Sequence, residues 1–344
     1  MTDATSTIEN ESDKTVERKK VAFVTGSTGF LGLHIVKQLA DDGWDVLALR
    51  RCTSRTSDLD KLAARQVEGD VLNKESLEIA VPDNVDAIFH VAADTSMWEK
   101  KNEWQNRVNI EGARNVVEIA LKKNAGRLIH TSSIGAYGKT EGVEISEAVP
   151  SRAMESGINY YRSKFLAEQE IHKGIAKGLD AVIMNPCQIV GPLDYNYTPL
   201  IFQNLKSGAM KGIPQGSSVL GHVRDYAKAH VTAYDKGRTG ENYLLGGVHA
   251  SFQDVFNTVG AILHVKTPTA PLPKPLLSFA AFVLGKISLF TNKEPLLTPE
   301  KVTLMNDKMV VSSKKAEDEL GFTTCTLQEM FMDSYQWMQR EQII

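Results

Sequence analysis

Tyr160 and Lys164 are a phenol and an amine four residues apart, a pair that can take part in proton transfer. Residues four apart on a helix lie on one face, so the ammonium of Lys164 would lie beside the phenol of Tyr160. A nearby cation favours the phenolate, and the spacing therefore predicts a lowered tyrosine pKa. Such a tyrosine can give or take a proton near neutral pH. The same spacing also arises as ordinary packing plus surface charge, so the surrounding elements decide its meaning.

A glycine-rich segment, residues 25–32 (TGSTGFLG), precedes this pair. It follows an apolar run, Val21–Thr25, that predicts a buried parallel strand, and it leads into apolar positions spaced as on a helix. Strand, glycine turn and helix in this order favour dinucleotide binding, because the helix start offers free N–H groups to phosphates. An ordinary tight turn is the alternative. The positions predicted to contact the cofactor here are Gly26, Thr28, Gly29, Phe30, Leu31 and Gly32.

A second predicted strand, residues 45–49, ends in Arg50 and Arg51. In dinucleotide-binding folds an acidic residue at this place holds the ribose hydroxyl of NAD, whereas an arginine accommodates the phosphate of NADP. Arg50 therefore favours NADP(H) over NAD(H). A solvated basic loop is the alternative, because surface arginines are common.

Further apolar runs at 65–68, 87–91 and 127–130 predict strands separated by helical segments. This alternation predicts an α/β fold, a Rossmann-type doubly wound parallel sheet. A polar or small pair follows each strand where a cofactor would lie. Asp70 could accept a hydrogen bond from the adenine amino group, or it could only form a turn. The pairs are Asp70 and Val71, Ala92 and Ala93, and Ser132 and Ser133.

Five segments carry a family resemblance: TGSTGFLG at 25–32, GDV at 69–71, HVAAD at 90–94, HTSSIGAYG at 130–138 with Tyr160-x-x-x-Lys164, and MNPCQIVGP at 184–192. In their order and spacing the chain resembles the extended short-chain dehydrogenase/reductases, also called the NAD-dependent epimerase/dehydratase family. The resemblance extends from about residue 21 to the C-terminus. RVNIEGARNVVEIAL at 107–121 is typical of the dihydroflavonol-reductase-like branch.

The resemblance implies roles for individual residues. Tyr160 would be the proton donor or acceptor, and Lys164 would lower its pKa and hold the nicotinamide ribose. Ser133 would hydrogen-bond the reacting oxygen, with Ser132 as a neighbouring alternative. Pro186 would lie near the nicotinamide. The branch also implies NADPH through the arginine after the second strand, and homodimers are common in the family.

The chain has 344 residues, which allows about two domains. Residues 1–19 are polar and charged and predict a disordered tail. We expect an NAD(P)-binding domain over 20–192 and a smaller, mainly substrate-binding domain over 193–344. A strand near 242–245 should return to the main sheet.

Charge and cysteine usage exclude several classes of function. A formal charge of −3 gives no argument for a nucleic-acid partner. The three cysteines are far apart and fit no disulfide framework, which predicts a reducing, cytoplasmic location. No metal-ligand spacing appears, so we expect no metal site. The N-terminus lacks the apolar core of a signal peptide.

The most apolar stretch is residues 276–284 (LLSFAAFVL), with Gly285 and Lys286 interrupting it. A spanning helix needs about 20 apolar residues, so the stretch predicts a buried helix of the smaller domain and no spanning segment. An interfacial membrane contact, or a lip for an apolar substrate, is the alternative.

Residues 216–220 (GSSVL) contain no basic side chain, although sugar-nucleotide epimerases usually carry an arginine near this place. A diphosphate needs compensating charge when it leaves water, so the absence argues against a nucleotide sugar. The sequence predicts an NADPH-dependent reductase of a carbonyl group on a hydrophobic or aromatic molecule. A sugar epimerase or dehydratase and a non-catalytic NADP sensor are the alternatives. Candidate pocket residues are Met97, Trp98, Met154, Tyr195 and Tyr197.

Overall fold

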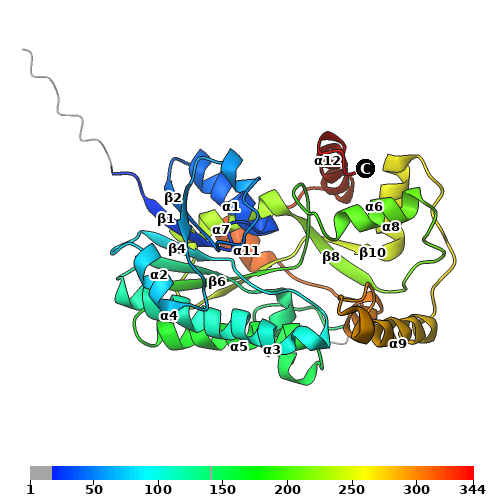
Figure 1. Cartoon of the computed structure of the whole chain (residues 1–344), viewed down its shortest axis with the longest axis horizontal. Helices are drawn as coiled ribbons and strands as arrows, with labels where there is room; N and C mark the ends of the chain where they lie inside the picture. The colour runs from blue at the N-terminus through cyan, green and yellow to red at the C-terminus, as the bar shows by residue number, and fades with distance from the viewer. Residues whose placement is uncertain (1–17, 140–141) are drawn as a thin grey trace, which may run out of the picture.

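The computed structural model describes residues 18–139 and 142–344. Figure 1 shows a larger unit, in which helices flank a sheet, beside a smaller unit that carries α6, α8, α9 and α12. The predicted disordered tail falls almost wholly outside the described residues. Its last two residues are exposed, and Arg18 forms an ion pair with Asp86 at 2.6 Å.

Seven parallel strands form the main sheet in the order β3-β2-β1-β4-β5-β6-β9. The order reverses between β1 and β4, the kind of switch point at which open α/β sheets bind ligands. The central strands are apolar and buried along most of their length, as a sheet covered on both faces requires. The strands are β1 Val21–Thr25, β2 Asp45–Arg50, β3 Arg65–Glu68, β4 Ala87–His90, β5 Arg127–Thr131, β6 Ala181–Pro186 and β9 Asn242–Leu245.

Helices cover both faces of this sheet, which confirms the predicted doubly wound Rossmann-type fold. One face packs against α1, α7 and α11, and the other packs against α2, α4 and α5. Each of these helices buries an apolar stripe against the sheet. Helix α5 differs from the others in that it also buries the charged side chains Lys164, Glu168 and Glu170. They are α1 Phe30–Asp41, α2 Lys74–Ala80, α4 Gly112–Lys122, α5 Asn159–Ile175, α7 Val223–Lys236 and α11 Lys314–Leu320.

A three-stranded sheet, in the order β10-β8-β7, organises the smaller unit. Its core includes side chains of α6, α8 and α12. Although α7, β9 and α11 lie within residues 193–344, they pack with the main sheet. A substrate-binding role for the remainder stays a prediction. The elements are β7 Gln188–Val190, β8 Ser217–His222, β10 Val248–Ser251, α6 Thr198–Lys206, α8 Phe252–Leu263 and α12 Leu327–Arg340.

Short helical turns follow several strands at the carboxyl edge of the main sheet, where the strand ends meet. These turns give the chain sharp changes of direction, so that side chains from different strands approach one another. They are η1 Leu59–Lys61, η2 Glu99–Lys101, α3 Asn102–Asn106, the π-helical η3 Arg107–Glu111, η4 Ile134–Tyr137 and η5 Ala153–Glu155.

The prediction of a buried helix over residues 276–284 is wrong. Helix α9 (Lys274–Thr291) lies at the lower right edge in Figure 1, and its buried residues are Leu277, Ala281 and Ser288. Its apolar contacts are with α10 (Pro299–Met305) and nearby loops on one side, which leaves the other side exposed. The helix also continues through Gly285 and Lys286. Within the described residues it is the one helix whose length and composition would allow a membrane crossing.

Candidate active site

The glycine turn joins the end of β1 to the start of α1. Gly26 has a φ of 66°, and a Cβ there would lie 2.6 Å from the backbone nitrogen of Ala92. A Cβ on Gly32 would overlap the carbonyl oxygen of Gly26. At Gly29 an added Cβ would meet only that same oxygen within 4 Å, at 3.2 Å. Gly26 and Gly32 are therefore packed directly against the backbone of other residues, whereas Gly29, at the start of the helix, has free space beside it.

Thr25 and Ser27 fix this turn to the neighbouring strands. The buried Thr25 hydroxyl accepts hydrogen bonds from the N–H groups of Val91 at 3.1 Å and Ala92 at 3.2 Å. It also lies 2.8 Å from Nδ1 of His90. Ser27 donates to a carbonyl of β2 at 2.7 Å. These roles were not predicted, because the partners are distant in the chain.

Arg50 and Asp70 lie at the ends of adjacent strands. The Arg50 guanidinium donates to Gln66 Oε1 at 3.1 Å and to Glu68 Oε2 at 3.2 Å. Its charge is thus held at the edge of the sheet and shared with a carboxylate. Asp70 Oδ1 accepts the N–H of Leu72 at 2.9 Å. In this structure Asp70 therefore forms a turn, which was the alternative to a contact with adenine.

Tyr160 lies in the first turn of α5, near Ser133 at the end of β5. Burial raises the pKa of Tyr160 and is the largest cause, while a hydrogen bond with Ser133 lowers it. The predicted lowering of this pKa is therefore wrong for the structure. A raised pKa keeps the phenol protonated, which suits a proton donor. The Ser133 hydroxyl also accepts the N–H of Gly135 at 3.1 Å and so caps η4.

Lys164 lies one turn further along α5 and is only 3% exposed. Its ammonium donates to the carbonyl oxygen of Thr131 at 2.9 Å. Burial lowers the pKa of Lys164 to about 8, and the carboxylate of Glu168 partly offsets that effect. The shared helix face was predicted, but the bond to the end of β5 was not. The lysine therefore links α5 to the strand that carries Ser133.

A buried network discriminates between the two serines. Ser132 donates to Glu168 Oε1 at 2.5 Å, and Asn185 donates to the same oxygen at 2.7 Å. Asn185 also donates to the backbone carbonyl of Ser133 at 3.1 Å. Burial raises the pKa of Glu168, whereas the hydrogen bonds from Ser132 and Asn185 lower it. The Ser132 hydroxyl is thus occupied by its hydrogen bond to Glu168, and the Ser133 hydroxyl is the one that hydrogen-bonds Tyr160.

Asn109, in the π-helical turn η3, joins a second strand end to α5. Its side chain accepts the N–H of Asp94 at 2.8 Å and donates to the Asp94 carbonyl at 3.0 Å. It also donates to Ser163 at 2.9 Å, which in turn donates to the Tyr160 carbonyl at 2.8 Å. Widened helical turns often occur at functional sites. A buried asparagine within the apolar pattern of 107–121 was the signal that could have indicated it.

The remaining predicted cofactor positions lie along the same edge of the sheet. Val71 is buried, whereas Ala92 and Ala93 are partly exposed beside the glycine turn. Pro186 ends β6 and pairs with Leu245 of β9. Positions from β1, β3, β4, β5 and β6 thus converge on one edge.

The five candidate pocket residues do not form one group. Met154 is 48% exposed, Tyr197 is 38% exposed and Trp98 is partly exposed, while Met97 and Tyr195 have different surroundings. Met97 packs in one cluster with Tyr160, Phe165 and Leu304. Tyr195 lies elsewhere: its hydroxyl donates to a carboxylate in the loop after β2 at 3.0 Å, and its ring lies edge-on to a tryptophan of α12. Of Met97 and Tyr195, only Met97 packs against the same apolar cluster as Tyr160.

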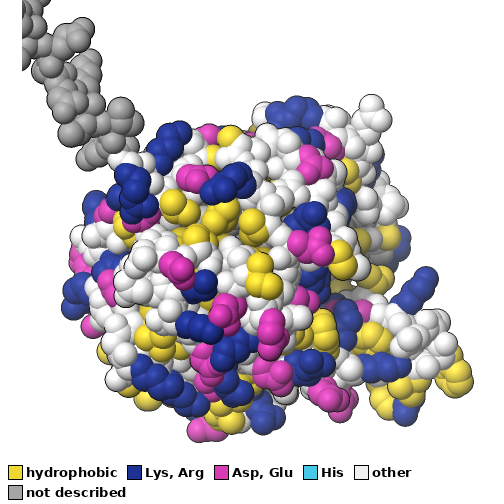
Figure 2. Space-filling view, turned by 60° about the vertical axis from the view of Figure 1, so that its left-hand side comes forward, with side chains coloured by type: hydrophobic (Ala, Val, Ile, Leu, Met, Phe, Trp, Pro, Cys, Tyr) yellow, Lys and Arg dark blue, Asp and Glu magenta, His cyan; other side chains and the backbone are white. Residues whose placement is uncertain are grey.

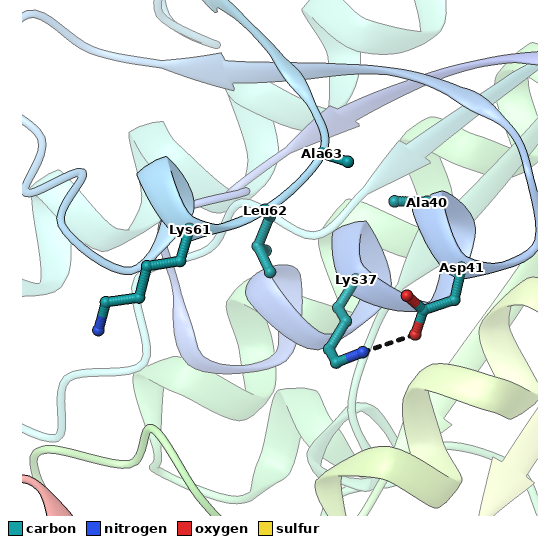
Figure 3. Close-up of a pocket in the computed structure, with 6 residues that line it drawn as sticks. All are labelled: Lys37, Ala40, Asp41, Lys61, Leu62 and Ala63. Carbon is teal, nitrogen blue, oxygen red and sulfur yellow. Dashed lines mark hydrogen bonds and ion pairs between the residues drawn. The ribbon is translucent and has the colours of Figure 1, made fainter.

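A pocket on another part of the surface lies at the C-terminal end of α1, the end opposite the glycine turn (Figure 3). It measures about 280 Å³. The ion pair of Lys37 with Asp41 at 2.6 Å lies at its rim, with both side chains 58% exposed. Exposed, mutually neutralised charges give no reactive group, so the pocket is not the chemical centre. Its lining residues are Lys37, Ala40, Asp41, Lys61, Leu62 and Ala63.

Comparison with known proteins agrees with this geometry. The model of the NAD dependent epimerase/dehydratase family matches residues 22–246. The chain belongs to that family. It is 32% identical to "Putative dihydroflavonol 4-reductase" of Synechocystis sp., over 92% of this chain and 94% of that protein. It is 27% identical to "Sterol demethylase protein B" of Methylococcus capsulatus, over 93% and 99%.

A solved structure agrees as well. The crystal structure of gox2253 superposes with a TM-score of 0.82 at 32% identity, covering 95% of this chain and all of that one. The matched proteins are NAD(P)-dependent oxidoreductases, epimerases and dehydratases, so this chain is an NAD(P)-dependent enzyme.

The residues present fit such a cofactor. The open position at Gly29 lies at the start of α1, where free N–H groups and the helix dipole attract phosphates. Arg50 and Asp70 end strands on the side where the adenosine part of a dinucleotide binds in this fold. Tyr160 and Lys164 lie across the switch point, where the nicotinamide end belongs.

Proposed function

We propose that this enzyme reduces a carbonyl group on a hydrophobic or aromatic small molecule, with NADPH as the hydride donor. The observation that carries the proposal is the group of a buried Ser133, a partly buried Tyr160 and a buried Lys164 at the sheet edge that the glycine turn also occupies. A bound nicotinamide would supply the hydride. What remains for the protein is to hold the carbonyl oxygen and to give it a proton.

Tyr160 is proposed as that proton donor. Its raised pKa keeps the proton in place until the oxygen gains negative charge. Ser133 would donate a second hydrogen bond to the same oxygen, and together they would stabilise the developing alkoxide. Lys164 would hold the ribose of the cofactor while its bond to Thr131 keeps α5 in register with β5.

The substrate class follows from the surroundings of Tyr160. Tyr160 packs, together with Met97, Phe165 and Leu304, against one buried apolar cluster, so its surroundings on this side are apolar. The buried members of that cluster are Ala153, Ile158 and Tyr161. The segment 216–220, mostly β8, carries no Lys or Arg of its own for a diphosphate. The basic residues that the fold brings beside Ser217 are His249, at 3.0 Å from its hydroxyl, and Lys308, whose backbone bridges to it. The names of the two relatives, which point to a flavonoid and a sterol, also support an apolar substrate.

The first experiment measures NADPH oxidation against sugar, aryl and long-chain aldehydes and ketones. Tyr160→Phe should lower kcat by about 10²–10⁴, the usual contribution of a positioned acid. NADPH affinity should stay unchanged. Tyr161→Phe is the matched control and should keep most turnover, because Tyr161 is buried with its ring against Gly135 and lacks the four-residue spacing to Lys164. Equal rates for the two variants would refute the assigned role.

Cofactor preference has a separate test at Arg50. Arg50→Ala should raise KM for NADPH by about tenfold or more and leave KM for NADH nearly unchanged, because only NADPH carries the added phosphate. Arg65→Ala is the control, since Arg65 forms its ion pair with Asp45 at the opposite end of the same strands, at 2.8 Å. An unselective effect of Arg50→Ala would leave the family function intact but overturn the NADPH preference.

Two other outcomes would favour one of the alternative functions. Cofactor that stays bound through purification, with no net oxidation by any carbonyl compound, would favour an epimerase or dehydratase. NADPH binding without turnover of any substrate class would favour the sensor.

A further inference from the structure

One face of α9 exposes large apolar side chains to solvent. Phe290 is 91% exposed, Phe279 is 65% exposed and Phe282 is 60% exposed. Leu276, Ile287 and Leu289 are also exposed on the same helix. Contiguous exposed apolar side chains of this size mark interaction sites rather than ordinary surface.

The opposite face shows why the helix keeps its position. Leu277 and Ala281 pack against Val302 of α10, with Leu272 and Leu297 at the margin. The helix is therefore fixed to the protein along one side. A helix held in this way presents its free face outward and does not need to leave the fold to make a contact.

Charge on and around this face has one sign. Lys274, Lys286 and Lys293 accompany the apolar side chains, and no Asp or Glu occurs between residues 274 and 293. Glu294 comes next, and its carboxylate already pairs with Lys101 at 3.1 Å and with Lys301 at 3.3 Å. In Figure 2 the lobe at the lower right, at the height where Figure 1 places α9, carries yellow and dark blue side chains with little magenta.

Lys286 shows how charge and apolar groups combine. Its ammonium lies 5.4 Å from the centre of the Phe282 ring. A lysine can extend its charged end from an apolar layer to the phosphates above it while its stem stays among acyl chains. An apolar helix face with interspersed cations and without acids is complementary to an anionic lipid surface.

We infer that this face of α9 binds the surface of an anionic phospholipid bilayer. The helix lies in the plane of the interface and does not cross the bilayer, because its packed face remains on α10. Anionic lipids are concentrated in the cytoplasmic leaflet, which agrees with the predicted cytoplasmic location. The inference does not depend on the proposed reductase activity.

The bound surface would lie beside the active site. Leu304 of α10 packs against the same buried cluster as Tyr160 and Met97. Glu300 of α10 accepts the N–H of Asn159, the residue before Tyr160, at 3.3 Å. The unit that carries the lipid-binding face is thus attached to the start of α5.

The test is flotation of the full-length protein with vesicles of phosphatidylcholine, with and without phosphatidylserine. We expect binding to the anionic vesicles and much weaker binding to the neutral ones. The triple change Phe279→Ser, Phe282→Ser and Phe290→Ser should weaken binding by about a hundredfold or more, because each ring loses its apolar environment. Ile79→Ser is the control, since Ile79 is 87% exposed on α2 at another part of the molecule.

A second pair of variants separates the charge from the apolar contribution. Lys286→Glu with Lys293→Glu should weaken binding to anionic vesicles by about tenfold or more and abolish the preference over neutral ones. Lys177→Glu with Lys236→Glu makes the same change of charge at exposed ends of α5 and α7 and should have little effect.

Three results would overturn the inference: no binding to either vesicle, equal binding to both, or wild-type binding by the triple variant. Sedimentation velocity identifies the competing occupant. A dimer that the triple variant converts to a monomer, with no vesicle binding by the wild type, would assign the face to a second copy of the chain. Circular dichroism of each variant verifies that α9 remains folded.

Discussion

The carboxyl edge of the main sheet and the outer face of α9 depart from ordinary burial in opposite ways. At the sheet edge Lys164, Glu168 and Ser132 are buried although they are charged or polar. On α9, Phe279 and Phe290 are exposed although they are apolar. Both arrangements carry a free-energy cost in the isolated chain, since burying an ion and hydrating a large ring are each unfavourable.

The difference lies in where each cost is offset. The sheet edge offsets it internally, because Thr131, Ser132 and Asn185 supply hydrogen bonds to the buried lysine and glutamate. The face of α9 has no such partner among the described residues, so its compensation must come from outside the molecule. Buried polar groups with hydrogen-bond partners therefore indicate a site within the fold. Exposed apolar side chains without a packing partner indicate a contact with another molecule.

Gly26→Ala is the substitution that should disturb the carboxyl edge of the main sheet most strongly. The φ of 66° disfavours any side chain, and the added Cβ would meet the backbone of Ala92 at 2.6 Å. We expect a loss of about 2–4 kcal/mol in the free energy of unfolding and a large loss of NADPH affinity. Chemical denaturation and fluorescence titration measure the two effects. Wild-type values for both would contradict the tight turn.

The pH dependence of turnover tests the buried lysine. Burial lowers the pKa of Lys164 to about 8, so its ammonium is lost as the pH rises through that value, while the raised pKa of Tyr160 keeps the phenol protonated. If the ammonium is required, kcat/KM for reduction should be constant below about pH 8 and should fall toward tenfold per pH unit above it. A profile that stays flat up to pH 10 would remove Lys164 from the mechanism.

Glu168→Gln sharpens this prediction. The carboxylate of Glu168 raises the pKa of Lys164, so its removal should move the alkaline fall of kcat/KM to lower pH. Glu170→Gln is the control, because Glu170 pairs with Arg114 and Lys173. A change in kcat without a displaced profile would mean that Glu168 acts only through packing.

Gly285→Ala tests α9 and should have the smallest effect of these substitutions. An added Cβ there meets nothing within 4 Å, and alanine favours a helix over glycine by about 0.5–1 kcal/mol. The thermal unfolding midpoint should therefore rise by about 1–3 °C. A fall would show that another surface packs against this position in solution.

Much of the fold could be predicted because its signals are local. The runs at 21–25, 65–68 and 242–245 are strands with those bounds, and the alternation of strands and helices gave the doubly wound sheet. The apolar run at 276–284 was assigned to the interior because an apolar composition cannot distinguish a buried helix from one whose partner is external. The difference is visible only in the packing of α9, whose apolar contacts among the described residues are with α10 and nearby loops on one side.

The site was predictable in its residues and less so in its electrostatics. Tyr160, Ser133 and the glycine turn were found from motifs, and their roles stay predictions. The predicted direction of the Tyr160 pKa was wrong, because the spacing suggests a cation beside the phenol but cannot show that burial of the phenol raises its pKa. The supporting hydrogen bonds of Asn109 and Glu168 were missed because their partners come from other elements.

The order of strands and helices, the position of the glycine turn and the four-residue spacing on α5 all follow from the amino-acid sequence alone. These depend on backbone conformation and on the periodicity of apolar residues, which neighbouring residues set. The tertiary structure alone decided which polar groups are desolvated, which serine lies beside Tyr160 and which face of α9 remains uncovered. Burial and hydrogen-bond geometry join residues far apart in the chain, so no local pattern contains them.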